Sequence, residues 1–429
     1  MDLQKITLEN FKCFQSETGI DFGKLTLLTG ANSSGKSSIL YSILGAIQSE
    51  EFPFQFSTNG KYVNMGDFNE IVYNHNKGKK IKLTYTFVNE TVHNIETLWE
   101  ENPKNKLPQL SELKISSNYL NLLMKYKNKK YTVDFEYNPE NDPQNKLKSP
   151  DDYIRILTRL PEEIIQPRTI MGLEIDDHPS NQEEKIKLYQ IIGNMLNLFR
   201  SFDNNLNFIS SFRLHPDRGY FETSKKNVKV GSDGKGYLDQ IVAWETNEPE
   251  KVNELLSILK NLHLLYDIKS KRSNGGKYDL LVKMKEDSIF TSLYDVGFGI
   301  SQFLPIIVAD MQLPNSSTLF VAQPEIHLHP SVQSSFGDYL FSQIKKSDKK
   351  YVIETHSEYL LNKIRLGIVK GDINESDVKV LFVDNEGIEA VIHEIRLNKN
   401  GQILDAPENF FKTYMIDVME IAINAADLS

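Results

Sequence analysis

The alternation of apolar and polar positions predicts that the chain opens with two strands, a helix and a third strand. Leu3–Asn10 alternates in the way a strand at a sheet edge does, and Gly23–Thr29 contains a short apolar run typical of a buried strand. Ser37–Ser49 carries apolar side chains at helical spacing, and a further strand is predicted at Ile81–Phe87. This order is typical of a compact α/β unit.

The same pattern returns after about residue 206 and predicts a second set of alternating strands and helices. The predicted strands are Phe208–Phe212, Tyr278–Met284, Thr318–Ala322 and Tyr351–Glu354, with a hairpin of Val378–Asp384 and Ile388–Ile395. The predicted helices follow a glycine-rich turn within Asp295–Asp310 and span Ser331–Ile344 and Asn409–Ala426. Because strands alternate with helices, we predict an α/β fold with a largely parallel sheet.

The region between these two parts differs in composition and is predicted to be a surface insertion. Residues 88–205 are richer in Asn, Lys and Glu, as in Asn138–Lys148, and we expect an α-rich insertion with one amphipathic helix at Ile186–Phe202. Heptads do not persist, which argues against a long coiled-coil arm. The predicted domains are therefore 1–87, the insertion 88–205, a second lobe 206–395 and a helical tail 396–429.

Composition narrows the class of protein without changing this picture. The chain has 429 residues, a formal net charge of −9 and a single cysteine, Cys13, which excludes a disulfide framework and a multi-cysteine zinc site. No run of about 18 apolar residues occurs, so we expect no membrane span and a cytoplasmic protein. The acidic balance argues against coating nucleic acid through bulk charge, although a local basic groove stays open.

The strongest chemical motif is a glycine-rich loop between the predicted strand and helix at the start of the chain. Gly30–Ser37 reads GANSSGKS and matches G-x-x-x-x-G-K-[ST]. Glycines let consecutive N–H groups turn inward toward phosphates, Lys36 supplies a positive charge, and the Ser37 hydroxyl can bind Mg²⁺. The residues predicted to contact ATP here are Asn32, Ser33, Ser34, Gly35, Lys36, Ser37 and Ser38.

Three later segments and the opening strand carry a resemblance to a known family. These are Asp295–Pro305, Leu319–Pro330, Glu354–Asn362 and Ile6–Phe14. In this order they resemble the ABC-type AAA ATPases of the RecF, SMC and OLD group. The resemblance implies an ABC-type P-loop NTPase head in which two protomers enclose ATP and Mg²⁺ as a homodimer or a higher homo-oligomer.

The resemblance also implies roles for residues of the second lobe. Gly297 and Gly299, in the signature turn, would contact the γ-phosphate bound by the other protomer. Gly297 stands where many relatives carry a serine, and Ser301 or Gln302 is expected to replace that hydroxyl. His356 would be the switch histidine that contacts the γ-phosphate or the attacking water.

The Walker B motif departs from the family pattern. Relatives typically read D-E-P-E or E-Q-P-E, whereas this chain reads Ala322-Gln323-Pro324-Glu325. Ala322 cannot bind Mg²⁺, Gln323 can orient water but cannot accept its proton, and Glu325 is the motif's one carboxylate. Three explanations stay open: an introduced Ala322 that traps ATP, a natural clamp that hydrolyses ATP poorly, or Glu325 acting as the base. Each of the first two predicts weak hydrolysis. His327 and His329 could suggest zinc, but the sequence offers no evident third ligand.

The functional expectation rests on the resemblance. Blocks at Asn59–Phe68 and Phe208–Tyr220 are similar to those of ATPase subunits of bacterial anti-phage systems such as Septu or PARIS. This implies an ATP-binding sensor or scaffold that gates a separate effector, a nuclease or toxin. The 64 residues after Arg365 are too few for the nuclease domain of OLD enzymes, which also points to a separate effector.

Two alternatives belong to other classes. One is a RecF-like DNA-binding ATPase of DNA repair or maintenance, and the other is an ATP-dependent oligomerisation module. The first would need a basic groove, and the candidate clusters lie at 77–80, 125–130, 225–226, 269–272 and 345–350. Solvated loop charges explain the same clusters equally simply.

Overall fold

The protein is described from a computed structural model, which carries side chains. The described residues are 2–88, 92–127, 130–138, 141, 154–161, 203–221, 229–385, 387–407 and 409–410. The predicted helices at 186–202 and 409–426 lie outside them, apart from the two residues 409 and 410. Within this part of the chain, no helix combines the length and apolar character that crossing a membrane requires.

The central element is a seven-stranded sheet built from both ends of the chain. Its spatial order is β10 (Leu206–Ile209), β15 (Thr318–Ala322), β16 (Lys350–Glu354), β3 (Leu25–Thr29), β17 (Val378–Asn385), β18 (Ala390–Leu397) and β19 (Ile403–Leu404). The first five strands are parallel and the last two pair antiparallel. The predicted α/β fold with a largely parallel sheet is confirmed, and β3 lies in its interior.

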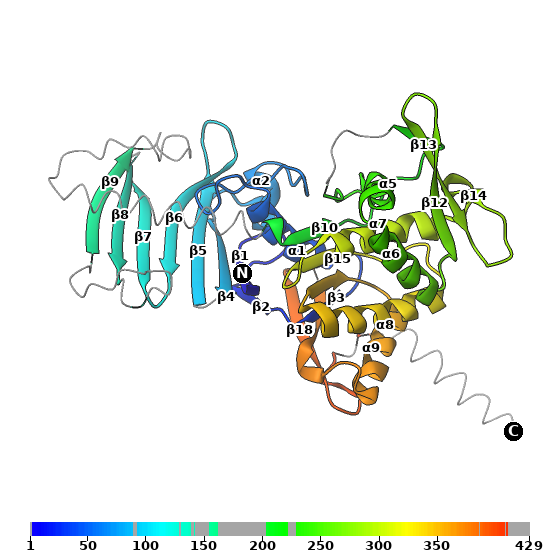
Figure 1. The fold of residues 1–429 in the computed structure, drawn as a ribbon. Helices are drawn as coiled ribbons and strands as arrows, with labels where there is room; N and C mark the ends of the chain where they lie inside the picture. The colour runs from blue at the N-terminus through cyan, green and yellow to red at the C-terminus, as the bar shows by residue number, and fades with distance from the viewer. Residues whose placement is uncertain are drawn as a thin grey trace, which may run out of the picture.

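Helices cover both faces of this sheet (Figure 1). The helices are α1 (Lys36–Ile47), α5 (Tyr237–Asn247), α6 (Pro249–Asn261), α7 (Phe298–Gln312), α8 (Pro330–Ser347) and α9 (Glu358–Lys370). Successive residues of a strand point to opposite faces. Leu28 accordingly packs in the core that contains α1, whereas Leu27 packs in the core that contains α7, α8 and α9. The sheet is thus buried on both sides, which explains why the β3 and β15 sequences are apolar without alternation.

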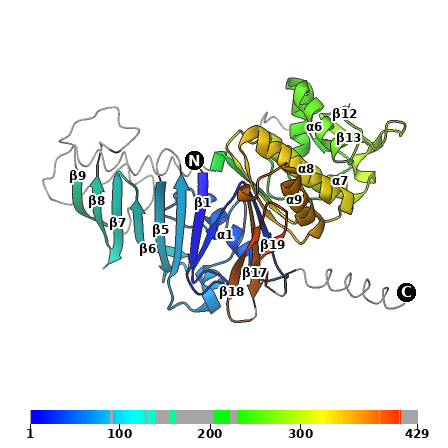
Figure 2. The same cartoon turned by 90° about the horizontal axis from the view of Figure 1, so that it is seen from below.

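A second sheet of eight antiparallel strands extends to one side of this head, with β9 at its far end (Figures 1 and 2). Its spatial order is β2 (Thr18–Asp21), β1 (Asp2–Glu9), β4 (Ile81–Val88), β5 (Val92–Glu101), β6 (Pro108–Ser116), β7 (Leu120–Lys127), β8 (Lys130–Tyr137) and β9 (Ile154–Pro161). Five of these strands lie in the predicted insertion.

The expectation of an α-rich insertion is therefore wrong for its described part, which is mainly β-structure. The alternation is present in β5, where buried and less buried residues follow one another, but charged and amide side chains occupy its outer face. A composition rich in Asn, Lys and Glu hid this period of two. Because every residue of β4 pairs with a residue of β5, the sheet continues past the predicted boundary at residue 88.

Smaller elements complete the described structure. A third sheet contains β11 (Tyr220–Phe221), β12 (Asp267–Ser273), β13 (Lys277–Lys283) and β14 (Thr291–Ser292). Short helical turns are α2 (Phe68–Ile71), η1 (Tyr73–His75), η4 (Leu293–Asp295) and η5 (Glu375–Asp377). The strand predicted at Tyr278–Met284 is β13, displaced by one residue at each end.

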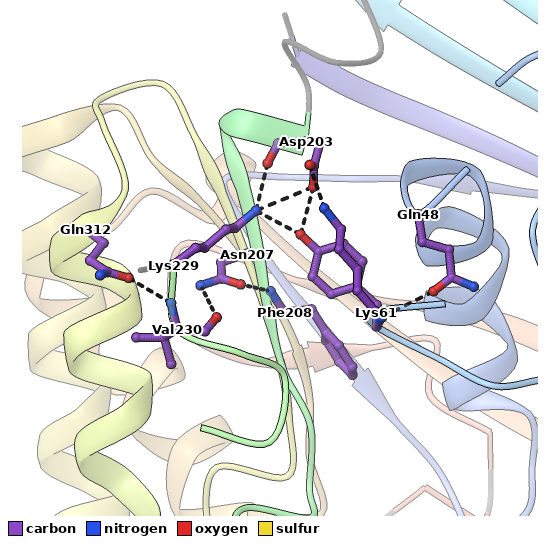
Figure 3. A network of polar contacts seen from close by, with 9 residues as sticks. Gln48, Lys61, Asp203, Asn207, Phe208, Lys229, Val230 and Gln312 are labelled. Carbon is purple, nitrogen blue, oxygen red and sulfur yellow. Dashed lines mark hydrogen bonds and ion pairs between the residues drawn. The ribbon is translucent and has the colours of Figure 1, made fainter. Parts of the chain in front are cut away.

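A polar network joins the N-terminal part of the chain to the edge of the central sheet, just before β10 (Figure 3). The Asp203 carboxylate accepts a hydrogen bond from Lys61 Nζ at 2.6 Å and another from Tyr62 Oη at 2.7 Å. Lys229 Nζ donates to Tyr62 Oη at 2.8 Å, and burial lowers the pKa of Lys229 to about 8. Three segments that are far apart in the sequence are thereby held together.

Candidate functional site

The glycine-rich loop forms a tight turn between β3 and α1, as its sequence predicts. Gly30 and Gly35 have φ angles of 138° and 115°, which residues with a side chain rarely adopt. A Cβ at Gly30 would overlap the Val383 carbonyl oxygen, and one at Gly35 would overlap Cys13 Sγ. Both glycines are therefore required by local conformation and by close neighbours.

The loop lines a pocket of about 510 Å³. The lining residues are Asn32, Ser33, Gly35, Lys36, Ser37 and Ser38 of the loop and helix, and Lys12, Cys13, Glu70, Val72, Asn74, His75, Ser211, Gln323 and Glu354 from elsewhere. Among the predicted loop residues, Ser34 is buried beside the pocket instead of lining it, and its hydroxyl has no hydrogen-bond partner. The structure thus brings the loop together with the ends of β15 and β16.

Lys36 lies in this pocket with its ammonium group turned toward the loop. Its Nζ donates to the carbonyl oxygens of Gly30 at 3.1 Å and Ala31 at 2.6 Å. Burial lowers the pKa of Lys36, while the negative charges of Glu354 and Glu325 oppose that change. A buried cation held by carbonyl oxygens beside an open pocket is well placed to bind an anionic group.

Ser37 contacts a carboxylate that the sequence interpretation did not single out. The Ser37 hydroxyl lies 3.1 Å from Oε1 and 3.0 Å from Oε2 of Glu354. Burial raises the pKa of Glu354, against the opposing effects of the Ser37 hydrogen bond and the Lys36 charge. An apolar strand that ends in a carboxylate was the pattern sought at 318–322. The same pattern at 351–354 would have identified Glu354.

The turn after β15 brings Gln323 into the pocket. Gln323 has a φ of 47°, which is uncommon for a residue other than glycine. Its backbone N–H donates to the Glu354 carbonyl oxygen at 2.7 Å, and this bond ties the two strand ends together. Gln323 is therefore in the position expected from the sequence, whereas Ala322 contributes only a methyl group that is largely buried.

Glu325 lies outside the pocket lining and supports the loop that carries His356. Its Oε1 accepts from the His356 backbone N–H at 2.7 Å, and its Oε2 accepts from Thr355 Oγ1 at 2.9 Å. Burial raises the pKa of Glu325, and burial together with the Lys36 charge lowers the pKa of His356. His356 itself is exposed, and its lowered pKa favours the neutral imidazole.

The predicted signature glycines lie apart from this pocket, at the start of α7. Gly297 is the N-cap of α7, and a Cβ built there meets no atom within 4 Å. A Cβ at Gly299 would lie 2.6 Å from the His327 carbonyl oxygen, so Gly299 is required for packing. Neither glycine lines the pocket around Lys36 of the same chain.

The expectation that Ser301 or Gln302 replaces a missing hydroxyl at this surface is wrong. Both side chains are buried. Ser301 Oγ donates to the Phe298 carbonyl oxygen at 2.9 Å, and Gln302 Nε2 donates to the Arg213 carbonyl oxygen at 3.3 Å. The helical turn points both side chains into the fold, away from any partner.

Arg213 is a further residue that the sequence did not identify. Its Nη1 donates to the Gln302 carbonyl oxygen at 2.9 Å, and its Nη2 donates to the Gln323 carbonyl oxygen at 2.7 Å. Burial lowers the pKa of Arg213 to about 10, so it remains charged at neutral pH. Arg213 thus connects the first turns of α7 to the turn that enters the pocket.

Four apolar side chains in the segment after β10 and near the start of α7 are exposed, and we call them the aromatic rim. Its members are Phe212, Leu214, Tyr294 and Phe298, which are between 38% and 88% exposed. The His215 ring packs on Phe298 with 4.7 Å between centroids, and His327 packs on the same ring at 5.1 Å. Clustered exposed apolar residues on a folded domain are typical of an interaction surface.

The two histidines considered as zinc ligands, His327 and His329, have structural roles in the described part of the chain. His329 Nδ1 accepts from the Ser331 backbone N–H and caps α8, and His327 packs as described. The described part of the chain contains no group of three metal-ligating side chains.

Several lysines of the basic clusters are paired with acidic side chains where the structure describes them. Ion pairs join Lys77 to Glu101, Lys80 to Glu100, Lys125 to Glu112, Lys345 to Asp372 and Lys350 to Asp2, at 2.7 to 3.7 Å. The cluster at 225–226 lies outside the described residues. Paired lysines offer less free charge to a nucleic-acid backbone than the sequence suggested.

The chain matches one protein family model and is similar to several solved structures. A family model described as an AAA ATPase domain matches residues 1–361. Among solved structures, the chain is similar to the SMC head domain from Thermotoga maritima, at 13% identity and a TM-score of 0.42, over 92% of this chain and 100% of that one. A second is the Smc head domain with an extended coiled coil, bound to the C-terminal domain of ScpA, from Pyrococcus furiosus. It has 11% identity and a TM-score of 0.36, over 98% and 99% of the two chains. No curated protein sequence matches.

Proposed function

Since the chain belongs to the family of AAA ATPase domains, we propose that it binds ATP with Mg²⁺ in the pocket around Lys36 and acts as an ATP-dependent switch. The observation that carries this proposal is the pocket itself. A strand–loop–helix turn rich in glycine presents Lys36 and Ser37 to a cavity that a carboxylate and an amide side chain also line. This donor set fits a polyphosphate and a magnesium ion.

Each group has a defined task at the nucleotide. Backbone N–H groups of Ser33–Lys36 and the N-terminus of α1 bind phosphate oxygens. Lys36 exchanges the carbonyl oxygens of Gly30 and Ala31 for phosphate oxygens, which are stronger acceptors because they are charged. The unpartnered Ser34 hydroxyl gains an acceptor in the same way. When bound, Mg²⁺ neutralises phosphate charge beside Ser37.

The signature glycines act on a second copy of the chain. Gly297 borders open space, does not line the pocket of its own chain and directly precedes Phe298 of the aromatic rim. A backbone N–H at the start of α7 can bind the γ-phosphate of the partner, because a helix N-terminus favours anions. The rim supplies apolar surface that a facing copy would cover. Two copies therefore enclose two nucleotides.

Hydrolysis in this arrangement is slow. A proton acceptor is missing at Gln323, which can only orient a water molecule. Glu325 is half-buried and both of its oxygens accept hydrogen bonds from the His356 loop, so it acts as a positioning residue. ATP then persists in the enclosed site and holds the dimer closed, which suits a switch better than a motor.

The closed dimer gates a separate effector, a nuclease or toxin, in anti-phage defence. This proposal rests on the sequence blocks at 59–68 and 208–220, together with the slow turnover expected of the site. The alternative, a RecF-like DNA-binding ATPase, requires a free basic groove. The ion pairs of Lys77, Lys80 and Lys125 remove part of the free basic charge that such a groove would use, which supports a protein partner.

The test is a change of charge at Gly297. Gly297→Asp places an acid at an N-cap, where aspartate favours the helix, and adds no clash within the protomer. We expect the variant to fold and to bind ATP as a monomer, but not to double its mass with ATP and Mg²⁺ in light scattering, because the new carboxylate repels the partner's γ-phosphate.

Asn400→Asp is the matched control, since it adds the same charge at an exposed turn far along the chain. It is expected to dimerise like the unsubstituted chain. Normal ATP-dependent dimerisation of Gly297→Asp would refute the enclosed-dimer proposal. An unsubstituted chain that retains no nucleotide would refute the switch as a whole.

A further inference from the structure

We propose that Glu354 holds the magnesium shell in this protein, so that the carboxylate missing at Ala322 is supplied from the neighbouring strand. This inference rests on the proposed function, because it concerns the nucleotide pocket. It assigns to Glu354 a role that the sequence pattern places at Ala322, in the preceding motif of the chain. The observations that carry it are the strand register, the contact with Ser37 and the burial of Glu354.

The register places Glu354 directly beside the vacant position. In the parallel pair of β15 and β16, Ala322 is the Cα partner of Glu354. Side chains at paired positions of neighbouring strands lie on the same face of the sheet. On its other side β16 pairs with β3, where Glu354 faces Leu28, two residues before Gly30. Glu354 is thus one strand closer to the phosphate-binding loop than Ala322 is.

The distance between the Ser37 hydroxyl and the Glu354 carboxylate matches the spacing of two neighbouring ligands of one metal ion. Magnesium takes oxygen ligands at about 2.0–2.1 Å in octahedral geometry, so neighbouring ligands are about 3 Å apart. The Ser37 hydroxyl lies 3.0 and 3.1 Å from the two oxygens of Glu354. A hydroxyl and a carboxylate already at this spacing need little movement to bind the ion or its water shell.

Burial indicates that Glu354 has a role beyond packing. Glu354 is 6% exposed, and a buried carboxylate costs free energy unless charges or hydrogen bonds compensate it. Glu325, which is half-buried, accepts hydrogen bonds from a backbone N–H and a hydroxyl of the His356 loop. The Glu354 carboxylate instead accepts from Ser37, whose own place is in the pocket, and feels the positive charge of Lys36. A cation bound at this point would compensate the buried negative charge of Glu354.

The experiment compares nucleotide binding with Mg²⁺ and with EDTA for the full chain and for Glu354→Gln. A fluorescent ATP analogue provides the affinity, and Mn²⁺ in place of Mg²⁺ provides a direct spectroscopic signal of the bound metal. We expect the unsubstituted chain to bind more tightly with the metal. Glu354→Gln should lose that enhancement, by about 10- to 100-fold, the range seen when even an outer partner of a metal is removed. Its affinity in EDTA should stay within a few-fold.

The matched control is Glu358→Gln, which removes the same charge four residues later at the start of α9. It should keep the full metal enhancement. Glu354→Ala provides the same comparison should the amide variant fold poorly. Exchanging the two side chains, as Ala322→Glu with Glu354→Ala, should restore part of the enhancement, because the carboxylate returns to the same face from the adjacent strand.

Two results would overturn the assignment, and they differ from each other. Metal enhancement retained in Glu354→Gln would show that Glu354 does not hold the ion. If turnover fell at the same time, Glu354 would instead be the proton acceptor. Absence of any nucleotide binding by the unsubstituted chain would refute the proposed function itself, and the metal assignment with it.

Discussion

At the scale of single residues, the site depends on buried polar side chains that do not use all of their hydrogen-bonding capacity within the protein. Lys36 donates to two loop carbonyl oxygens, and Ser34 leaves its hydroxyl without a partner. Such groups lose water on folding and recover the cost only when a ligand arrives. The pocket is therefore polar in a way that favours a phosphate-bearing molecule over an apolar one.

Lys36→Ala should weaken ATP binding by about 10- to 100-fold, the range for losing a hydrogen bond to a charged group. The free energy of unfolding should change little or increase, because burial already disfavours the ammonium group, as its lowered pKa indicates. A titration with a fluorescent nucleotide and a urea unfolding curve measure the two effects. If ATP affinity and the free energy of unfolding fell by similar free energies, Lys36 would stabilise the loop instead of binding the ligand.

At the scale of elements, the site is assembled from the ends of three neighbouring parallel strands. The loop follows β3, Glu354 ends β16 and Gln323 follows β15, so that all three reach the same edge of the sheet. This is where ligands bind in open α/β sheets, because loops from adjacent strands leave a crevice there. Arg213 adds a link from this edge to α7, which carries Gly297.

Arg213→Met should destabilise the fold by about 2–4 kcal/mol, because it leaves the buried carbonyl oxygens of Gln302 and Gln323 without a donor. Urea unfolding measures this loss. Arg218→Met is the control, since Arg218 is exposed and pairs with Asp295 at the surface, where such a pair contributes about 0–1 kcal/mol. A similar loss of unfolding free energy in both variants would contradict the proposed role of Arg213 in connecting α7 to the turn after β15.

At the scale of the whole molecule, the polar network of Lys61, Tyr62, Asp203 and Lys229 links the segment after α1 to the residues on either side of β10 (Figure 3). Its charges respond differently to pH. The pKa of Asp203 is lowered: burial would raise it, but hydrogen bonds and the positive charges of Lys61 and Lys229 outweigh that effect. Burial lowers the pKa of Lys229 and raises that of Tyr62.

The pKa of Lys229 predicts the pH dependence of stability. Its pKa falls from 10.5 in the unfolded chain to about 8 in the fold, so between these values the unfolded state binds more protons. The contribution of Lys229 to the free energy of unfolding should therefore increase as the pH rises from 8 toward 10. Below pH 8 both states are charged and the contribution should be constant.

The measurement is urea unfolding at pH 7, 8.5 and 10 for the unsubstituted chain and for Lys229→Met. The difference between the two should change in favour of the unsubstituted chain across this range. Parallel pH profiles would contradict the prediction. Tyr62 affects both proteins in the opposite direction above its ordinary pKa of 10, because its raised pKa keeps it protonated in the fold. The comparison between variants removes most of that effect.

Some elements of the fold could be predicted from the sequence because the information was local. The strand Thr318–Ala322 is found with the predicted bounds, and α8 and β16 differ from prediction by a few residues. The strands β15 and β16 are buried along nearly their whole length, so their apolar runs are unambiguous. The strands of the insertion were missed because polar residues on their outer faces hid the alternation, although each strand pairs with the next one along the chain.

What the sequence by itself determined is the phosphate-binding loop and the type of sheet around it. Glycine conformations, the spacing to Lys36 and Ser37, and the apolar period of β3 and α1 all depend on neighbours within a few residues. Only the tertiary structure decided which carboxylate reaches that loop. Glu354 lies 317 residues from Ser37 in the chain, and the order of strands in a sheet is set by packing between distant segments, which no local pattern records.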